Sequence, residues 1–367
     1  MQEQSIHSRT YRLLGPYQME EVTVNRTINE GEVVVEPLIA SICHADLRYF
    51  MGQRKPEVLT KKLPMALLHE GIGRVVESKC NSVSVGDRVV IVPNIPGHLL
   101  KKGHPEECSS YSQQEFIANY GEKNVFLGSG YDGIAQNRLV LPAECAIPIP
   151  DSLPNEIAVL SELCTVSYHA LSRVKQKLES SQDTTVAVFG DGPVGYLTAA
   201  MIHHVYNLGP ERLTVFGAID EKLKQFTFAS RELVQNYDFK SSKKVDIIVE
   251  CTGGAFSEHA INQGIDLVAR GGTIILMGVS EDLVPINTRD VLEKGLSLYG
   301  SSRSSSADYY AVMKAMENIE YQKTLRAILP KRNTPIHNLS DFQTAMKSAS
   351  EHRHWEKIIL DFDWSAS

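Results

Sequence analysis

A glycine-rich turn between an apolar strand and a helix constrains the fold of this chain more than any other segment. Residues 185–189 predict a strand, which runs directly into Gly190-Asp191-Gly192-Pro193-Val194-Gly195, a match to G-x-G-x-x-G. Apolar residues then recur at helical spacing until Gly209-Pro210. Such a turn lets a pyrophosphate approach the free N–H groups at a helix start. The motif predicts a dinucleotide site formed by these six residues, with an ordinary tight turn as the alternative.

The pattern around this turn predicts two domains within the 367 residues. Apolar segments at 213–216, 246–249 and 273–277 alternate with helical stretches, which indicates a parallel sheet covered by helices on both faces. The first 150 residues instead carry short β-rich segments separated by turns, typical of an irregular antiparallel domain. Four prolines between Pro142 and Pro154 mark the crossing between the two patterns.

The end of the second strand bears on the choice of dinucleotide. An NAD-binding unit usually places Asp or Glu there, about 20 residues after the glycine turn, to hold the ribose 2′-hydroxyl. The segment L-T-V-F-G-A-I-D-E-K puts Gly217 at that position, so a 2′-phosphate would meet no repulsion, and Lys222 or Lys224 could reach it. We therefore expect NADP(H). If Asp220 occupies the strand end instead, the preference reverses, and both lysines could equally lie on a solvated helix face.

Three separate segments carry candidate metal ligands: Cys43, then His69 and Glu70, then Glu162. Thiolate, imidazole and carboxylate all suit zinc, and a catalytic zinc needs three protein ligands and one open position. Taken singly, a cysteine or histidine more often has a structural role. The zinc hypothesis therefore depends on the combination.

The order of these segments, with Gly130-Tyr131-Asp132-Gly133 between them and the glycine turn after them, resembles the zinc-dependent medium-chain dehydrogenases over nearly the whole chain. The resemblance implies an α/β fold in which a Rossmann-type, doubly wound parallel sheet is inserted into an irregular, mainly antiparallel, GroES-like catalytic domain. The catalytic domain would comprise residues 1–150 and 300–367, and the dinucleotide-binding domain residues 151–299. Cys43, His69 and Glu162 would bind one catalytic zinc, with Glu70 as a direct or exchange ligand.

Two departures from that family are visible. Many members bind a structural zinc through four closely spaced cysteines, whereas residues 93–116 contain only Cys108, so we expect no structural zinc. The position two residues after the zinc cysteine is commonly a Ser or Thr that relays a proton, but here it is Ala45. Proton delivery must therefore use another route.

A closer resemblance is to the ribulose-5-phosphate reductases, also called ribitol-5-phosphate 2-dehydrogenases. The matching stretches are C-H-A-D-L-R-Y-F-M-G-Q-R from Cys43, K-L-P-M-A-L-L-H-E from Lys62, N-T-R-D-V-L-E-K-G-L from Asn287 and G-S-S-R-S-S-S from Gly300. The resemblance implies NADPH-dependent reduction of D-ribulose 5-phosphate to D-ribitol 5-phosphate, with zinc polarising the C2 carbonyl. The product would feed CDP-ribitol and ribitol-phosphate polymers of teichoic acid or capsule, through a cytidylyltransferase as functional partner.

The resemblance also implies a homodimer, since many relatives join their cofactor-domain sheets. Two alternatives stay open at this point. One is an NAD-dependent dehydrogenase of an unphosphorylated polyol such as sorbitol or xylitol. The other is a non-catalytic NADPH-binding protein that kept the fold.

A local excess of basic residues offers a place for a substrate phosphate. Residues 48–62 contain five basic side chains and one acid in a chain with a net charge of −7. Arg48, Arg54 and Lys62 are candidate phosphate ligands because charged donors suit a dianion. Arg303 joins them because it matches a position where polyol dehydrogenases place a substrate-contacting arginine. For any one of these residues, a solvated surface position is an equally good interpretation.

Charge and hydropathy argue against some other partners. The excess of 44 acidic over 37 basic residues disfavours nucleic acid. No apolar run reaches the roughly 18 to 20 residues that span a bilayer, and the polar first ten residues lack the apolar core of a signal peptide. We therefore expect a cytoplasmic protein without a membrane span.

Overall fold

The structure is a computed structural model that describes residues 5–100, 119–351 and 355–365. It divides into two compact units. Unit 1 comprises Met1–Glu162, Ser304–Glu317 and Leu329–Ser367, and unit 2 comprises Leu163–Arg303 and Asn318–Ile328. The first boundary therefore falls at Glu162 rather than near residue 150, and a short segment after residue 317 returns to unit 2.

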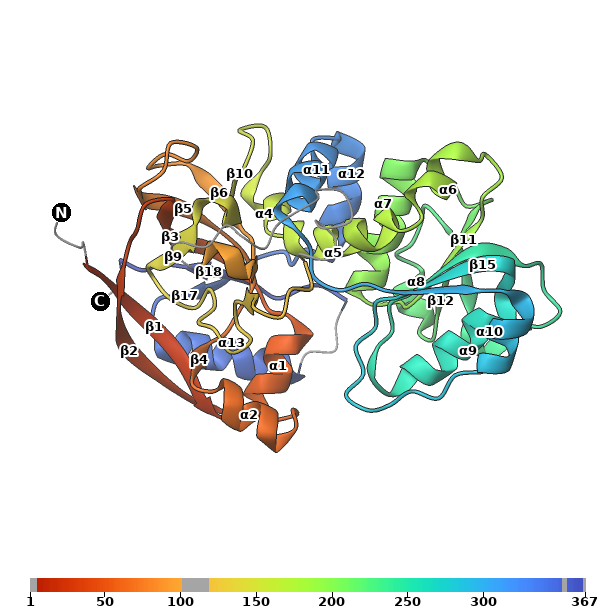
Figure 1. The fold of residues 1–367 in the computed structure, drawn as a ribbon, viewed down its shortest axis with the longest axis horizontal. Coiled ribbons are helices and arrows are strands. Elements are labelled where there is room, and N and C mark those ends of the chain that lie inside the picture. The colour runs from red at the N-terminus through yellow and green to blue at the C-terminus, as the bar shows by residue number, and fades with distance from the viewer. Residues whose placement is uncertain (1–4, 101–118, 352–354, 366–367) are drawn as a thin grey trace. The chain divides into compact units, whose positions relative to one another are not determined.

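Unit 1 is built from mainly antiparallel sheets (Figure 1). A three-stranded sheet has the order β2-β1-β4, with β1 (Ser5–Gly15), β2 (Gln18–Thr27) and β4 (Met65–Ala66). A seven-stranded sheet has the order β10-β6-β5-β3-β18-β17, with β9 also paired to β3. Its strands are β3 (Glu32–Ser41), β5 (Glu70–Ser78), β6 (Arg88–Ile91), β9 (Leu139–Pro142), β10 (Ala146–Pro148), β17 (Thr334–Ile336) and β18 (Ile359–Phe362). A two-stranded ladder joins β7 (Asn94–Ile95) and β8 (Val125–Phe126).

The C-terminal strand completes the large sheet of unit 1. Strand β18 pairs antiparallel with β3, so segments more than 300 residues apart in the chain share one sheet. The helices of this unit are α1 (His44–Phe50), α2 (Pro56–Lys62), α4 (Asn155–Ala158), α11 (Ser306–Met316) and α13 (Leu339–Glu351). Short 3₁₀ turns are η1 (Gly97–Leu99) and η2 (Ala143–Cys145).

Unit 2 is a six-stranded, all-parallel sheet with the order β13-β12-β11-β14-β15-β16. Its strands are β11 (Val186–Phe189), β12 (Leu213–Gly217), β13 (Ser230–Leu233), β14 (Val245–Glu250), β15 (Val268–Leu276) and β16 (Ser297–Gly300). The order reverses between β11 and β14, as in a doubly wound sheet. All four residues of β11 are buried, as expected for a strand covered on both faces.

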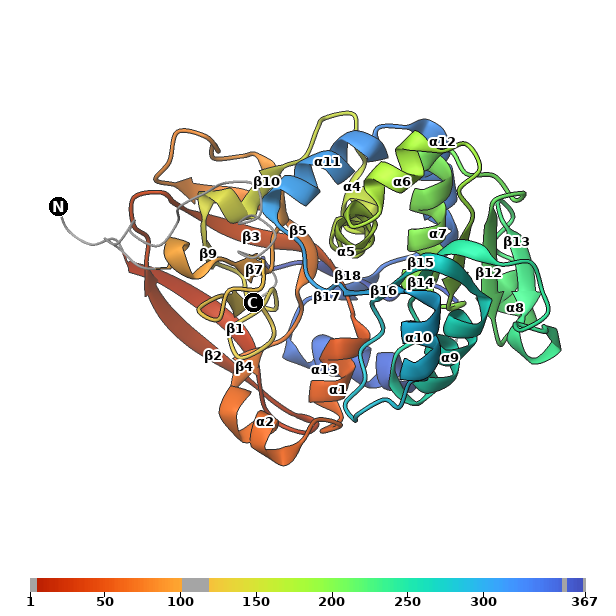
Figure 2. The ribbon, with the colours of Figure 1, turned by 45° about the vertical axis from the view of Figure 1, so that its right-hand side comes forward.

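Helices cover both faces of this sheet. Figures 1 and 2 show α7 with α12 on one face and α9 with α10 on the other. The helices of the unit are α5 (Ser161–Ser172), which starts at the boundary, α6 (Lys175–Ser180), α7 (Pro193–Tyr206), α8 (Asp220–Leu223), α9 (Ser257–Leu267), α10 (Thr288–Lys294) and α12 (Ile319–Leu325). Its 3₁₀ turns are η3 (Val234–Asn236), η4 (Gly254–Phe256) and η5 (Arg326–Ile328). The predicted α/β fold class is confirmed.

No helix within the described ranges combines the length and apolar character needed to cross a bilayer.

Candidate functional site

Three of the predicted metal ligands lie together in unit 1. Cys43 precedes the first turn of α1, His69 lies just before β5, and Glu70 is the first residue of β5. The antiparallel register of β3 and β5 pairs Ser41 with Glu70, which brings the two segments side by side. One ligand atom from each of Cys43, His69 and Glu70 lies within 4.8 Å of the others. The sheet register thus creates a cluster with the ligand chemistry that zinc prefers.

Asp46 contacts two of these ligands and orients them. The sequence analysis did not predict this role. Its side chain is fully buried. One oxygen accepts a hydrogen bond from the Cys43 N–H at 3.0 Å, and the other lies 3.4 Å from His69 Nδ1. A carboxylate behind a ligating imidazole fixes the orientation of the ring. The spacing of Cys43 and Asp46, a capping-box pattern at the start of α1, is the sequence signal that could have revealed this role.

The backbone before His69 is held in an unusual conformation. Leu68 has φ of 74°, a left-handed value uncommon for a residue with a side chain. Its N–H donates to Asp46 Oδ1 at 3.0 Å, and its carbonyl accepts from the Ile134 N–H at 2.9 Å. Gly133 packs so closely here that a Cβ would lie 2.2 Å from the Leu68 oxygen. These contacts maintain the turn that directs His69 toward Cys43.

A buried ion pair joins the cluster to the last strand region of the chain. Lys357 donates from Nζ to Glu70 Oε2 at 2.8 Å and to the Ile42 carbonyl at 2.9 Å. Ser41 Oγ donates to the same Glu70 oxygen. Glu70 and Lys357 are 1% and 8% exposed, so each charge depends on the other in a low-dielectric setting. Sequence reasoning missed Lys357, which lies 287 residues from its partner.

Burial and neighbouring charges shift the proton affinities of the cluster. Burial, and then the charge of Glu70, raise the pKa of the Cys43 thiol. Burial opposes a charged His69, but Asp46 and Cys43 outweigh it and hold the pKa of His69 well above its ordinary value. Metal ligands bind in their deprotonated forms, so a cation held here would displace protons from these groups.

Glu162, near the start of α5, also lies within electrostatic range of the cluster. Its side chain is buried, and burial, aided by Glu70 and against the effect of His69, raises its pKa to about 7. The group of ligand atoms within 4.8 Å does not include Glu162 among the described residues. The structure therefore brings Cys43, His69 and Glu70 together, and leaves the role of Glu162 as a ligand a prediction.

Two of the predicted phosphate ligands gather around one tyrosine in unit 1. Lys62, the last residue of α2, donates from Nζ to Tyr49 Oη at 3.0 Å and to Ser129 Oγ at 2.7 Å. The Arg54 guanidinium carbon lies 4.7 Å from the centroid of the Tyr49 ring. Among the described residues, Lys62 has no carboxylate within 4.0 Å. A half-buried ammonium whose described hydrogen-bond partners are two hydroxyl groups is suited to an added anion.

Arg48 and Arg303 are the other two predicted phosphate ligands. Arg48 is half-buried in α1. Arg303 belongs to unit 2 and has φ of 61°. Gly130-Tyr131-Asp132-Gly133 has a structural role, because buried Asp132 accepts hydrogen bonds from Arg12, Arg26 and the Ala66 N–H.

The glycine turn has the predicted form in unit 2. Gly190 has φ of 135°, and a Cβ on Gly195 would lie 2.0 Å from the Gly190 oxygen. Gly192 is the residue before α7, and a Cβ there would meet nothing within 4 Å. With Pro193 and Val194, these residues leave open space at the start of a 14-residue helix. That geometry fits a pyrophosphate.

The end of β12 follows the expected register. Gly217 is the last residue of β12, and Asp220 begins α8. The strand end itself carries no acid, as predicted, but the carboxylate of Asp191 in the glycine turn lies beside it, which the sequence did not indicate. Asp191 Oδ2 accepts from the Ala218 and Ile219 N–H groups at 2.8 Å each. A Cβ on Gly217 would lie 2.7 Å from the Asp191 Cβ, so glycine is needed here to admit that side chain.

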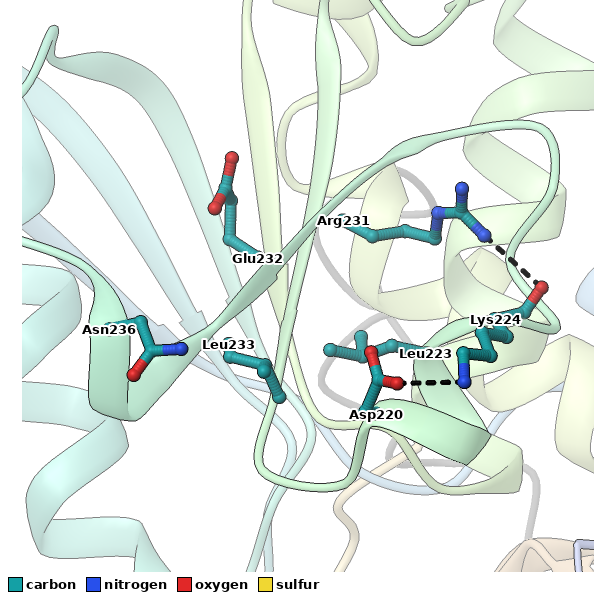
Figure 3. Close-up of a pocket in the computed structure, with 7 residues that line it drawn as sticks. All are labelled: Asp220, Leu223, Lys224, Arg231, Glu232, Leu233 and Asn236. Atoms are coloured by element: carbon teal, nitrogen blue, oxygen red, sulfur yellow. Dashed lines mark hydrogen bonds and ion pairs between the residues drawn. The ribbon is translucent and has the colours of Figure 1, made fainter.

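A polar pocket of about 380 Å³ lies beside this strand end (Figure 3). Lys224 lines it and pairs with Asp220 at 2.9 Å, and it also pairs with Glu221 at 2.6 Å. Arg231, on β13, donates to the Lys224 carbonyl at 3.2 Å (Figure 3). Half-buried Lys222 is not among the lining residues.

The predicted absence of a structural zinc concerns residues 93–116, most of which lie outside the described residues.

Comparison with known proteins identifies the family. Residues 29–151 match the family model "Alcohol dehydrogenase GroES-like domain", and residues 203–318 match "Zinc-binding dehydrogenase". Ribulose-5-phosphate reductase 1 of Staphylococcus aureus is 38% identical over 96% of this chain and 98% of that protein. The chain belongs to the ribulose-5-phosphate reductase family of zinc-binding dehydrogenases.

Two further members of the ribulose-5-phosphate reductase family support this assignment. The ribulose-5-phosphate reductase of Bacillus spizizenii is 34% identical over 97% of this chain and 99% of that protein. The crystal structure of S. aureus TarJ in complex with NADPH is similar with a TM-score of 0.81, 34% identity, and coverage of 98% of this chain and 100% of that chain. The resemblance inferred from the sequence is confirmed, and the protein is a member of an NAD(P)-linked dehydrogenase family. That membership favours an enzyme over the non-catalytic alternative.

Proposed function

We propose that this protein reduces D-ribulose 5-phosphate to D-ribitol 5-phosphate with NADPH. The single observation that carries the proposal is the cluster of half-buried Cys43 with buried His69 and Glu70, in a chain 38% identical to a ribulose-5-phosphate reductase over nearly its full length. When bound, NADPH supplies the hydride, and zinc supplies a Lewis acid that polarises the C2 carbonyl. The product would feed CDP-ribitol and ribitol-phosphate polymer synthesis by way of a cytidylyltransferase.

The donor set supports one catalytic zinc. Cys43 and His69 would bind it, and the paired Asp46 would keep the imidazole oriented. Glu162 would be the third ligand. Without metal its pKa is raised to about 7, and binding of zinc would displace the proton from its carboxyl group. Glu70 is tied to Lys357 and Ser41, which favours a supporting or exchange role. Since Ala45 cannot relay a proton, we assign delivery to water held near Glu70 or to a substrate hydroxyl.

The basic cluster around Tyr49 supports a phosphorylated substrate. Lys62 and Arg54 place two positive charges near one aromatic ring, and Ser129 adds a hydroxyl donor. Charge-assisted hydrogen bonds from such groups favour a dianion over a neutral polyol. We assign Lys62 and Arg54 to the phosphate, and retain Arg48 and Arg303 as further candidates.

Several features of unit 2 support NADPH. A relative that is 34% identical was crystallised with NADPH, and β12 itself ends in Gly217 without an acidic side chain of its own. Asp191 already accepts two N–H groups there, which compensates its charge. Lys222, and Lys224 with Arg231 in the adjoining pocket, are the cations for a 2′-phosphate.

The edge of the parallel sheet supports a homodimer. Strand β16 ends the sheet, and no described strand pairs with its outer edge. Tyr299 on β16 is 36% exposed, and Leu283 and Leu292 nearby in sequence are 99% and 80% exposed. An exposed strand edge with apolar neighbours is suited to pairing with a second copy.

The proposed reaction predicts a specific substrate and metal dependence. Oxidation of NADPH, followed by absorbance, should be rapid with D-ribulose 5-phosphate and at least about 100-fold lower in kcat/KM with D-ribulose, because the phosphate contacts are lost. NADPH should exceed NADH, and prolonged chelation should abolish turnover until zinc is restored. Reduction of D-ribulose at an equal rate, or rapid oxidation of sorbitol or xylitol with NAD+, would favour the polyol alternative.

The phosphate assignment predicts the effect of changing Lys62. K62M should raise KM for D-ribulose 5-phosphate by about tenfold or more, since one charge-assisted contact contributes about 1.5 to 3 kcal/mol, and leave kcat largely unchanged. The matched control is K61M, which alters the neighbouring exposed lysine. An unchanged KM in K62M would remove Lys62 from the phosphate site.

A further inference from the structure

A buried carboxylate joins two loops at one edge of the parallel sheet in unit 2. Glu250 is the last residue of β14 and is fully buried. Its Oε1 accepts from the Thr252 N–H at 2.8 Å, the Gly253 N–H at 3.2 Å and the Thr252 hydroxyl. Its Oε2 accepts from the Gly278 N–H at 3.1 Å. One side chain therefore connects the loop after β14 to the loop after β15.

The two loops lie in close contact at this point. A Cβ on Gly278 would lie 2.4 Å from the Gly253 nitrogen and 2.6 Å from each Glu250 carboxylate oxygen. The Gly254 N–H donates to the Val279 carbonyl at 2.9 Å. Gly253 has φ of 70°, which a residue with a side chain rarely adopts. The backbone here is thus shaped around the carboxylate.

Only a carboxylate satisfies this arrangement. No Lys, Arg or His among the described residues lies within 4.0 Å of Glu250. Its donors are three N–H groups and one hydroxyl, and they approach both oxygens. A glutamine side chain has one acceptor oxygen, so its amide would direct N–H toward N–H on one of the two loops. Glu250 is therefore suited to holding the two loops together. It has no described cationic partner, so an ion pair does not explain its presence here.

The position of these loops links them to one end of the cofactor. In a doubly wound sheet, dinucleotides bind outside the carboxyl ends of the strands, across the point where the strand order reverses. The glycine turn and the end of β12 belong to the half of the sheet that holds the adenosine nucleotide. The loops after β14 and β15 belong to the other half. We propose that Glu250 is a positioning residue that holds these two loops in place for the nicotinamide nucleotide end of the cofactor.

The test compares two ligands that differ only in that end. E250Q should raise the Kd of NADPH, measured by its fluorescence, about tenfold, because one loop loses a hydrogen bond to a charged acceptor. The Kd of 2′-phospho-ADP, which lacks the nicotinamide nucleoside, should change less than about twofold by calorimetry. T252V provides a second variant on an exposed residue, with an expected rise of about threefold for NADPH alone.

The matched control lies at the opposite end of the same strand. Asp246 accepts from the Thr185 N–H at 2.9 Å and the Thr185 hydroxyl at 2.8 Å, at the amino-terminal side of β14. D246N should leave both dissociation constants unchanged. Equal weakening of both ligands in E250Q, or no change in either, would overturn the proposal. If E250Q does not fold, T252V decides, and an unchanged NADPH affinity in that variant overturns it.

The proposal uses the NADPH assignment above only to choose the probe. Failure of that assignment would appear in the unsubstituted chain, as binding of NADH in preference to NADPH. The same comparison would then be made with NADH and ADP, so the two failures are distinguishable.

Discussion

Replacing Cys43 with alanine is expected to abolish zinc binding and to lower kcat/KM for D-ribulose 5-phosphate by at least about 10³. The thiolate is the softest ligand of the cluster, and the remaining His69 and acidic groups would bind zinc weakly. Loss of Lewis-acid stabilisation amounting to about 4 kcal/mol corresponds to a thousandfold change in rate. Zinc content of the purified protein, measured by elemental analysis, and initial rates of NADPH oxidation provide the test.

The control for this experiment is C80A. Cys80 is also a half-buried thiol of unit 1, and its partners are Ser78, Ser82 and the Val83 carbonyl rather than metal ligands. NADPH affinity should be preserved in both variants, because the glycine turn belongs to unit 2. Full zinc occupancy in C43A, or equal activity losses in C43A and C80A, would contradict the proposed metal centre.

Replacing Lys357 with methionine is expected to be the most destabilising single change near the site. Removing the ammonium leaves the Glu70 carboxylate buried without its cation, which costs about 3 to 5 kcal/mol of unfolding free energy. Burial opposes the charged Lys357, but Glu70 and Cys43 raise its pKa, so Lys357 carries its charge at neutral pH. Urea denaturation of the metal-free protein should show a large loss of stability in K357M.

Two comparison variants test whether the loss of stability in K357M comes from the buried ion pair rather than from removing any lysine. The double variant K357M/E70Q should recover much of the stability, because it removes the uncompensated charge. K323M breaks an exposed pair with Glu320 at 2.7 Å and should change the free energy of unfolding by less than about 0.5 kcal/mol. Similar losses in K357M and K323M would show that the buried pair has no special role.

Much of the fold was accessible from local sequence patterns. The strands of unit 2 could be predicted because parallel strands covered on both faces are continuous apolar runs. The glycine turn could be placed because Gly190 and Gly195 occupy positions where a Cβ does not fit. Candidate ligands Cys43 and His69 could be named from residue type and family order. The domain boundary at Glu162 could not, because it falls at the start of a continuous helix with no local break.

The partners that organise the sites depended on long-range contacts. Lys357 reaches Glu70 only because β18 pairs with β3 and β3 pairs with β5, so that distant segments share a sheet. Asp191 reaches the end of β12 only through the packing of the glycine turn against Gly217.

The amino-acid sequence alone determined the fold class, the glycine turn and the ligand types, because strand periodicity, turn chemistry and metal affinity are properties of short segments. Tertiary structure alone decided which acid supports which ligand, and which loops Glu250 joins. The reason is physical: burial and charge pairing depend on the distance between atoms in space, which spacing along the chain does not specify.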